Sequence, residues 1–259
     1  MDKVSKKTVQ IIIPVYKTVL SALEKRSLQQ AYTVMESYPI TIIKPESLDV
    51  SALIAEFPRV NIRSFDDSYF RGISGYNKLM LSSTFYRSFI DTEYILIYQL
   101  DAFVFRDELS DWCSRGYDYI GAPWLKKPVY HLPVISWIMR YTLKLDLQNG
   151  KPNKQLLYNK VGNGGLSLRK VESHYQATEK HKEKIAHFLV QRRYHLFNED
   201  VFWSTLPDFS YPESTEALRF SFDKYPRLSY ELTGKQLPFG CHGWYKRKMK
   251  KFWQPIIKF

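Results

Sequence analysis

The chain has 259 residues and is 44% hydrophobic, 16% aromatic and 25% charged, a composition that belongs to a folded globular protein and excludes a disordered one. Its formal net charge is +12, but seven Lys or Arg and no acid follow Glu231, so most of the charge lies in a C-terminal segment and the rest of the chain is only mildly basic. Two cysteines, Cys113 and Cys241, cannot build a zinc site by themselves and are typical of a reducing compartment.

Neither of two apolar stretches has the properties of a targeting or membrane segment. The N-terminal segment MDKVSKKTVQIIIPVY contains an apolar run that is too short for a signal-peptide core. Residues 129–145 are interrupted by His131, Pro133 and Arg140 and fall short of the roughly 20 apolar residues that span a bilayer. We therefore expect a cytoplasmic protein without a membrane span, peripheral at most on the inner face of the membrane.

The first half of the chain alternates short apolar runs with helical patterns. Apolar runs typical of buried strands lie at 8–14, 39–45, 60–65 and 93–98, and helical patterns lie at 18–36 and 74–89. This alternation predicts an α/β fold with a mostly parallel sheet flanked by crossover helices. In such sheets, ligands bind in the crevice at the carboxyl ends of the strands.

The second half of the chain is less regular. Residues 121–161 mix proline, aromatic residues and lysine without sustained periodicity, which predicts an irregular insertion or lid. A polar helix follows around 172–192, and the sequence contains neither an internal repeat nor a linker to a second domain. We therefore predict a single domain over residues 1–245, followed by a basic aromatic tail over 246–259 whose helix ends at Pro255.

A carboxylate interrupts the densest apolar run of the chain. In EYILIYQLDAFVFRDEL (93–109), Asp101 follows a predicted strand, while Ile95, Ile97 and Phe103 are expected in the core. A position at a strand end explains the acid, because there it can project into the ligand crevice. An aspartate that only caps the strand or forms a salt bridge is an equally simple alternative.

Two further motifs contain clustered glycines and paired acids. VGNGGLSLR (161–169) matches neither a P-loop nor a dinucleotide turn, and its glycines indicate either close approach of a ligand to the backbone or a tight turn. NEDVFW (198–203) has the pattern of a helix start, where Asn198 could cap the helix and the helix dipole favours acids. Adjacent acids point in different directions, so one of Glu199 and Asp200 can pair with a cation while the other faces the crevice as a general base. A capping role alone is the alternative.

A histidine near the C-terminus is the third candidate. PFGCHGW (238–244) places His242 between small residues and close to Trp244. A lone histidine is more often structural than a ligand. Together with a carboxylate in the same crevice, however, it could complete a site for Mn²⁺ or Mg²⁺ bound with phosphate oxygens, because imidazole and carboxylate ligands suit these ions.

The order of five motifs resembles a bacterial family of uncharacterised glycosyltransferase-like proteins with the GT-A fold, the DUF5672 type. The motifs, behind an Ile-rich first strand, are QLDAF, YIGAPW, GNGGLSLR, NEDVFW and PFGCHGW. The resemblance covers residues 8–245. It implies a Rossmann-type sheet, a nucleotide-sugar donor, and transfer of a hexose-like sugar to an acceptor hydroxyl in surface-glycan synthesis.

The resemblance also implies residue roles on the donor side. In GT-A enzymes, a DxD aspartate pair ends a central strand and holds a divalent cation under the donor diphosphate. Here Asp101 matches the last aspartate and Gln99 departs from the first, while His242 matches a C-terminal histidine ligand found in several such enzymes. The expected Mn²⁺ or Mg²⁺ would therefore be held by Asp101 and His242. The donor-binding candidates are Gln99, Asp101, Gly164, Gly165, Asn77 and Lys78.

The acidic motif resembles that of inverting transferases, in which the second acid is the catalytic base. Asp200 would take the proton from the acceptor hydroxyl as it attacks the anomeric carbon, and Glu199 would orient hydroxyl groups. An acidic pair can also bind the donor in a retaining site, so the stereochemistry stays open, as do the sugar, the nucleotide and the acceptor. Trp124, Trp203 and Trp244 are candidates for stacking on sugars, with packing in the core or lid as the alternative.

A rival function rests on the basic tail. A module that binds nucleic acid or an anionic surface without catalysis would use its interleaved lysines and aromatic residues, but the acidic crevice motifs disfavour it, and we expect no nucleic-acid partner. We expect instead that residues 245–259 dock on an anionic membrane, near a glycan or lipid-linked acceptor. A solvated basic helix that packs on the body through the same aromatic residues is the alternative.

Overall fold

The computed structural model describes residues 8–191 and 195–258. Parts of three predicted segments therefore lie outside the described residues. They are residues 1–7 of the N-terminal segment, residue 192 of the helix predicted around 172–192, and residue 259 of the tail.

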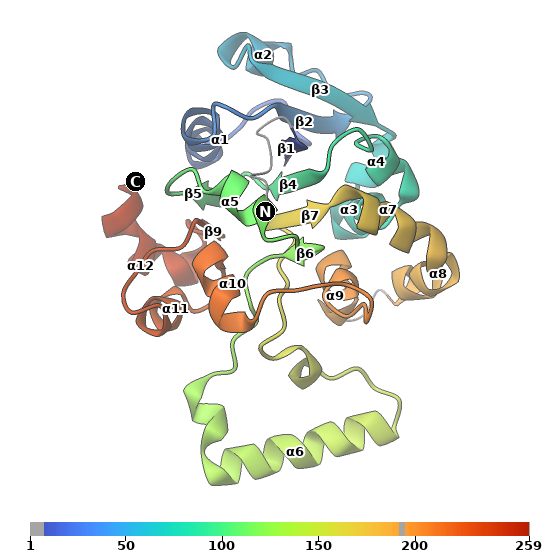
Figure 1. The fold of residues 1–259 in the computed structure, drawn as a ribbon, viewed down its shortest axis with the longest axis vertical. Helices are drawn as coiled ribbons and strands as arrows, with labels where there is room; N and C mark the ends of the chain where they lie inside the picture. Colours follow the sequence, from blue (N-terminus) through green and yellow to red (C-terminus); the bar gives the residue numbers. More distant parts are fainter. Residues whose placement is uncertain (1–7, 192–194, 259) are drawn as a thin grey trace.

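Within the described residues, a six-stranded sheet forms the centre of the fold, in the order β3-β2-β1-β4-β7-β6 (Figure 1). Strands β1, β2, β3 and β4 pair in parallel, whereas β7 runs antiparallel to β4 and to β6. The predicted α/β fold with a mostly parallel sheet is confirmed. The strand bounds are β1 (Val9–Pro14), β2 (Ile40–Pro45), β3 (Val60–Phe65), β4 (Tyr94–Tyr98), β6 (Tyr119–Ile120) and β7 (Leu166–Lys170).

Helices cover both faces of this sheet, because alternate side chains of the central strands point to opposite sides. Ile11 and Leu96 belong to the core cluster under one set of helices, and Ile12 and Ile95 belong to the cluster on the other face. The first set is α1 (Ala22–Val34), α2 (Ser51–Glu56) and α5 (Leu109–Ser114). The second set is α3 (Gly72–Met80), α4 (Ser83–Arg87), α7 (Val171–Lys180), α8 (Lys182–Val190) and α9 (Glu199–Trp203).

Two of the predicted helices are each divided in two. The helix expected at 74–89 stops at Met80 and restarts at Ser83, because the Ser82 hydroxyl caps α4 by accepting the N–H of Phe85 at 3.2 Å. The helix expected around 172–192 is interrupted at His181, between α7 and α8. Hydrophobic periodicity does not reveal a cap or break within a helix. The sequence pattern therefore predicted one helix where the structure has two, in both segments.

A smaller sheet, in the order β5-β9-β8, lies beside the large one and carries the C-terminal helix. Helix α12 (Arg247–Ile257) packs on it through Met249, Trp253 and Ile257. The prediction that Pro255 ends this helix is wrong, because Trp253 and Ile257 are both anchored in the core and Arg26 donates a hydrogen bond to the Ile257 carbonyl. The remaining elements here are β5 (Ala102–Val104), α10 (Ser214–Phe220), β8 (Ser221–Phe222), α11 (Pro226–Leu232) and β9 (Gly240–His242).

Residues 121–161, which we call the projection, extend away from the body (Figure 1). They leave through a two-stranded stem in which Pro123 bridges Val161, and the Trp124 N–H donates to the Lys160 carbonyl at 3.0 Å. The predicted insertion is present, but its centre is a regular helix of 16 residues, α6 (Pro133–Gln148). The short 3-10 helices whose bounds lie within the described residues include η2 (Asp67–Phe70), η3 (Pro128–His131), η4 (Lys154–Leu157) and η5 (His195–Phe197). Among the described helices, none combines the length and the apolar character that crossing a bilayer requires.

Candidate functional site

A cavity of about 620 Å³ opens at the carboxyl ends of β1 and β4. The turn after β4, helix α3, the start of β7, the start of α9 and the residues around the end of β9 all contribute to its wall. It brings together eight of the predicted site residues: Asn77, Gln99, Asp101, Gly164, Gly165, Glu199, Asp200 and His242. The location is that expected for a ligand site in a parallel sheet.

One wall of the cavity is a charged cluster around His242. Its Nε2 lies 3.0 Å from Asp101 Oδ1, and its Nδ1 lies 3.2 Å from Asp223 Oδ1. Lys246 places its ammonium 2.7 Å from the other Asp101 oxygen. Asp101 therefore faces two cationic partners, and the two ligands predicted for a metal lie side by side in one cavity.

The hydrogen-bonding state of His242 fits a role as a metal ligand. Nδ1 is held by Asp223, whereas Nε2 is buried and lacks the alignment of a hydrogen bond to Asp101 despite its short distance. A carboxylate behind a ligating imidazole is the usual arrangement in metal sites. Two ligands at about 2.1 Å from one octahedral ion lie about 3 Å apart, close to the observed Nε2 to Oδ1 separation.

The donor set for a cation is nevertheless small. No group of three or more His, Cys, Asp or Glu in the described residues is placed to hold a metal. A cation at Asp101 and His242 would therefore depend on oxygens from a phosphate ligand and water, as Mg²⁺ commonly does. The Lys246 ammonium lies against the same carboxylate.

The pKa values in this cluster follow from burial and opposite charge. Burial disfavours the charged form of His242, but Asp101 and Asp223 outweigh it and raise the pKa of His242 to about 9. Burial likewise opposes ionisation of Asp101, but His242 and Lys246 hold its pKa well below the usual range. Without a cation the cluster is thus built from ionised groups that stabilise one another, and a divalent cation would bind to His242 only by displacing the proton on Nε2.

Of the two adjacent acids, Glu199 is the one that forms an ion pair within the protein, with the guanidinium of Arg169. Its Oε1 accepts from Arg169 Nη2 at 3.0 Å, and both side chains are almost completely buried. Burial, more than any other factor, raises the pKa of Glu199 to about 7, against the attraction of Arg169. Its second oxygen, Oε2, is buried and has no hydrogen-bond partner among the described residues. Glu199 can therefore still accept a hydrogen bond from a ligand hydroxyl.

Asp200 lies beside Glu199 but makes different contacts. Oδ1 accepts from the backbone N–H of Val201 at 2.9 Å. Burial raises the pKa of Asp200, against the backbone N–H groups of Val201 and Gly164, which favour its charged form. A carboxylate in a cavity with a raised pKa has the properties of a general base.

The start of α9 is fixed by Asn77 and not by a side-chain cap. The predicted capping by Asn198 is wrong, since its side chain makes no cap hydrogen bond and instead accepts from Asn77 Nδ2 at 3.4 Å. Asn77 Oδ1 in turn accepts the N–H of Glu199 at 3.1 Å. Asn77 thus positions the acidic pair from the neighbouring helix.

Two glycines, Gly164 and Gly165, leave room for the side chains of Glu199 and His242 at the wall of the cavity. A Cβ added at Gly164 would overlap the Glu199 carboxylate, and one added at Gly165 would overlap the His242 ring. The glycine-rich motif is therefore explained by close approach of side chains from α9 and β9 to the start of β7.

Replacement Gly165→Ala is expected to displace the His242 ring and to lower the affinity for a divalent cation or a nucleoside diphosphate by at least tenfold. A displacement of about 1 Å of a positioned side chain, here the His242 ring, can lower activity or affinity strongly. Isothermal titration with Mn²⁺ and with a nucleoside diphosphate measures the effect. Gly150→Ala is the matched control: Gly150 has φ +63° and nothing within 4 Å of an added Cβ, so only backbone strain is introduced. Equal affinities for the two variants would contradict this role of Gly165.

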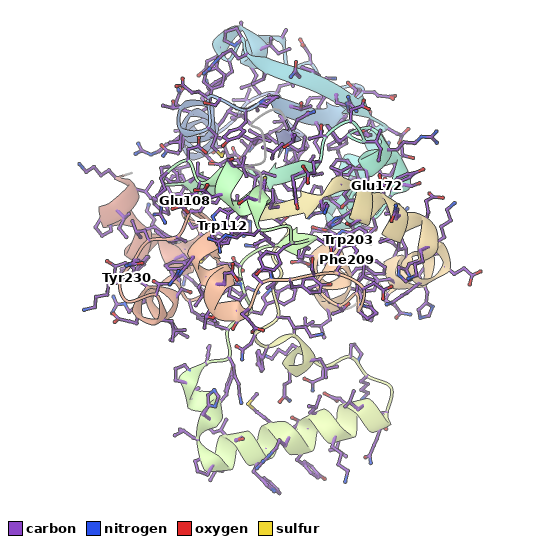
Figure 2. The ribbon with its side chains drawn as sticks, viewed as in Figure 1. Glu108, Trp112, Glu172, Trp203, Phe209 and Tyr230 are labelled. Carbon is purple, nitrogen blue, oxygen red and sulfur yellow. The ribbon has the colours of Figure 1, made fainter. Side chains whose placement is uncertain are left out.

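Four predicted residues are not brought to the cavity. Lys78 is exposed on α3, and Trp124 is half-buried in the stem of the projection; neither lines the cavity. Trp203 and Trp244 are fully buried, which leaves no ring face for a sugar. Trp203 stacks on Phe209 in the core (Figure 2), with ring centroids 5.9 Å apart, and Trp244 packs against Phe103. Their aromatic size stabilises the core instead.

Among the residues that the sequence reasoning missed at the site, three bear on its chemistry. Asn163 of the glycine-rich motif and Lys246 of the basic tail line the cavity. Asp223, directly after the short strand β8, contacts His242 from outside the cavity lining. Asn163 accepts the N–H of Gly165 at 3.0 Å, while its Nδ2 is buried without a partner among the described residues. The acid after an apolar run was the available signal for Asp223, as it was for Asp101.

Comparisons with known proteins agree with this architecture. The family described as "Protein of unknown function (DUF5672)" matches residues 59–242. A sequence search among curated proteins finds no match. Among solved structures, apo mouse xyloside xylosyltransferase 1 is 13% identical with a TM-score of 0.52, over 90% of this chain and 96% of that chain.

Two further solved structures have the same fold. Galactosyltransferase LgtC, in complex with donor and acceptor sugar analogs, is 11% identical with a TM-score of 0.53, over 90% of this chain and 86% of that chain. The bifunctional glycosyltransferase WbbM, in its apo form, is 13% identical with a TM-score of 0.52, over 93% of this chain and 46% of that chain. At these identities the likeness shows the fold alone, which is that of GT-A glycosyltransferases.

Proposed function

The chain belongs to the DUF5672 family, and from its fold and cavity we propose that it is a glycosyltransferase that moves a sugar from a nucleotide-sugar donor to an acceptor hydroxyl. One observation carries the proposal. Asp101, His242 and Lys246, which we propose bind the donor diphosphate, line the same cavity as the acidic pair Glu199 and Asp200. A group-transfer reaction with an anionic leaving group and a hydroxyl nucleophile needs both.

The donor diphosphate is proposed to bind at the charged cluster. Lys246 would contribute positive charge, and Asp101 and His242 would hold Mn²⁺ or Mg²⁺. Such a cation would offset the charge of the departing diphosphate when bound. Gln99 lines the same part of the cavity and offers an amide in place of the missing acid, so it can donate a hydrogen bond to a phosphate oxygen.

The acceptor hydroxyl is proposed to bind near Asp200. Asp200 would take the hydroxyl proton as the hydroxyl oxygen forms its bond to the anomeric carbon. The bond between that carbon and the diphosphate oxygen breaks, and the electron pair leaves with the nucleoside diphosphate. Direct displacement of this kind inverts the anomeric configuration. Glu199 Oε2 and Asn163 Nδ2, both buried without partners among the described residues, would bind sugar hydroxyl groups as acceptor and donor.

The variant Lys246→Ala tests the donor-binding assignment. Hydrogen bonds to charged groups contribute about 1.5–3 kcal/mol, so donor affinity should fall by about tenfold or more. The measurement is a thermal-shift and calorimetric screen of nucleotide sugars, with and without Mn²⁺. Ligand at about 100 times its dissociation constant should stabilise the native protein by about 2.7 kcal/mol.

Lys248→Ala is the matched control for this experiment. Lys248 lies two residues further along, exposed on α12 and away from the cavity wall, so it has the same charge but no proposed contact with the donor. Its affinity for the donor should equal that of the unchanged protein. If both variants lose affinity alike, the net charge of the C-terminal segment and not the Lys246 ammonium attracts the donor.

A further inference from the structure

Helix α6 carries a row of exposed apolar side chains. Val134 (70% exposed), Trp137 (61%), Ile138 (47%), Tyr141 (53%) and Leu145 (38%) are spaced three or four residues apart, so they lie on one face of the helix. No residue of α6 is buried. We call these five residues the outer face of α6.

The opposite side of the helix is held by the rest of the projection. Ile135 and Met139 are only half-exposed, and Gln155 of η4 donates to the Met139 carbonyl at 2.8 Å. Asn153 donates to the Asp146 carboxylate at 2.6 Å. The outer face therefore points away from these contacts, and its exposure is a property of the folded projection. Helix α6 thus has apolar residues both on its outer face and on the side of Ile135 and Met139. This explains why residues 121–161 show no single apolar stripe of helical period.

The projection is strongly basic. Residues 121–161 contain seven Lys or Arg and one acid, so they supply +6 of the formal net charge of +12. Arg140 and Lys144, four residues apart, flank the outer face on α6 itself. The single acid, Asp146, is engaged by Asn153. A surface that is both apolar and positive fits an anionic lipid headgroup region with acyl chains beneath it.

The aromatic residues of the outer face also fit a lipid interface. Trp137 and Tyr141 stack, with ring centroids 5.8 Å apart and an interplanar angle of 7°. Tryptophan and tyrosine are enriched at membrane interfaces because one end of each ring system is apolar and the other polar. The stacked pair presents this combination at the part of the molecule farthest from the sheet (Figure 1).

The C-terminal tail, by contrast, has its apolar side turned inward. Trp253 is fully buried and Met249 and Ile257 nearly so, all in one cluster with Trp244. Apart from Ile256, which is 37% exposed, the tail presents mainly lysine and arginine side chains to solvent. Among the aromatic residues predicted to insert, Trp253 is fully buried, and Tyr245 and Phe252 are half-buried.

We propose that the outer face of α6 docks this protein on an anionic membrane surface. A second copy of the chain is a poorer occupant, because a symmetric contact would bring two +6 projections against each other. The stem strand that ends at Val161 continues directly into Asn163 and Gly164 of the cavity wall, so docking would tether the cavity to the lipid surface through the projection. If the proposed transferase function is correct, a lipid-linked acceptor would then be within reach.

Vesicle co-sedimentation tests the docking without any assay of activity. The full chain should pellet with vesicles of phosphatidylcholine and phosphatidylglycerol in equal parts, and stay in solution with phosphatidylcholine alone. The triple variant Trp137→Ser, Ile138→Ser, Tyr141→Ser should lose the pelleted fraction. Since all three side chains are exposed, circular dichroism and thermal unfolding should be unchanged. The variant Arg140→Gln, Lys144→Gln should weaken partitioning by about thirtyfold.

Tryptophan fluorescence gives a second readout. Four of the six tryptophans, Trp112, Trp203, Trp244 and Trp253, are at most 2% exposed, while Trp124 is half-buried in the stem of the projection. A blue shift on addition of anionic vesicles should therefore be lost in Trp137→Phe and be kept in Trp124→Phe. Three results would overturn the proposal: no binding to anionic vesicles at low salt, binding that survives the triple variant but is lost in Lys248→Gln, Lys251→Gln, or a dimer in solution that the triple variant dissociates.

Discussion

Replacement of Asp200 by asparagine is expected to lower the rate of sugar transfer by about 10²–10⁴-fold while donor affinity changes less than threefold. The carboxylate lies in the cavity and its pKa is raised by burial, so it is equipped to accept a proton near neutral pH. Asparagine keeps the shape and the hydrogen bond from Val201 but cannot take the proton. Single-turnover rates and donor titration measure the two quantities separately.

The pH dependence of transfer supplies the control for Asp200. A base must be ionised to act, so the rate should fall as pH drops through the pKa of Asp200, which burial places above that of an ordinary aspartate. The residual activity of Asp200→Asn should lack this acid limb. Near-normal turnover in the variant would remove the role and leave Asp200 as a donor-binding group, with a retaining route open.

Replacement of Arg169 by methionine is expected to reduce the free energy of unfolding by about 3–5 kcal/mol, because it leaves a buried carboxylate without its partner. Arg169 is fully buried, donates to Glu199 at 3.0 Å and also donates to the Tyr86 hydroxyl at 3.0 Å. Denaturant unfolding measures the loss. Burial already raises the pKa of Glu199 to about 7 with Arg169 present, so folding favours the protonated acid. Without Arg169 this pKa should rise further, so the decrease of stability as pH rises above about 4.3 should be larger in the variant than in the unchanged protein.

The double variant Arg169→Met, Glu199→Gln separates charge from packing. Glutamine removes the unpaired charge, so the double variant should be more stable than Arg169→Met alone, and its stability should depend less on pH. If instead the two losses simply add, the ion pair contributes little beyond packing, and the interpretation of Glu199 as a charge held by Arg169 fails.

The sheet and most of the cavity wall could be predicted because they depend on local patterns. The apolar runs that became β1 and β4 alternate between the two cores, and Asp101 stood out as an acid in such a run. Glycines before β7 indicated close approach, although the approaching groups proved to be Glu199 and His242 of the protein itself. The carboxyl ends of parallel strands lie at the same edge of the sheet. Residues at these strand ends can therefore be predicted to lie near one another without knowledge of the helix positions.

Contacts between distant segments could not be predicted from these patterns. Asp223 and Lys246 reach Asp101 and His242 only because β8 and β9 pair and α12 docks beside them. The same docking buries Trp244, so packing in the core, the alternative to stacking on a sugar, applies to it. Long-range packing decides whether an aromatic or basic residue faces a ligand, a core or solvent, and local pattern does not report it.

Release of nucleoside diphosphate from a panel of nucleotide sugars, in the presence of Mn²⁺ and of simple sugar acceptors, measures whether the protein transfers sugars. We expect at least one donor to be cleaved faster with the protein than without it. The release should be lost in the double variant Asp101→Asn, His242→Ala and should be at least 10²-fold slower in Asp200→Asn. If no nucleotide sugar binds or is cleaved, or if the double variant releases nucleoside diphosphate at the unchanged rate, the cavity around Asp101 and His242 is not a glycosyltransferase site.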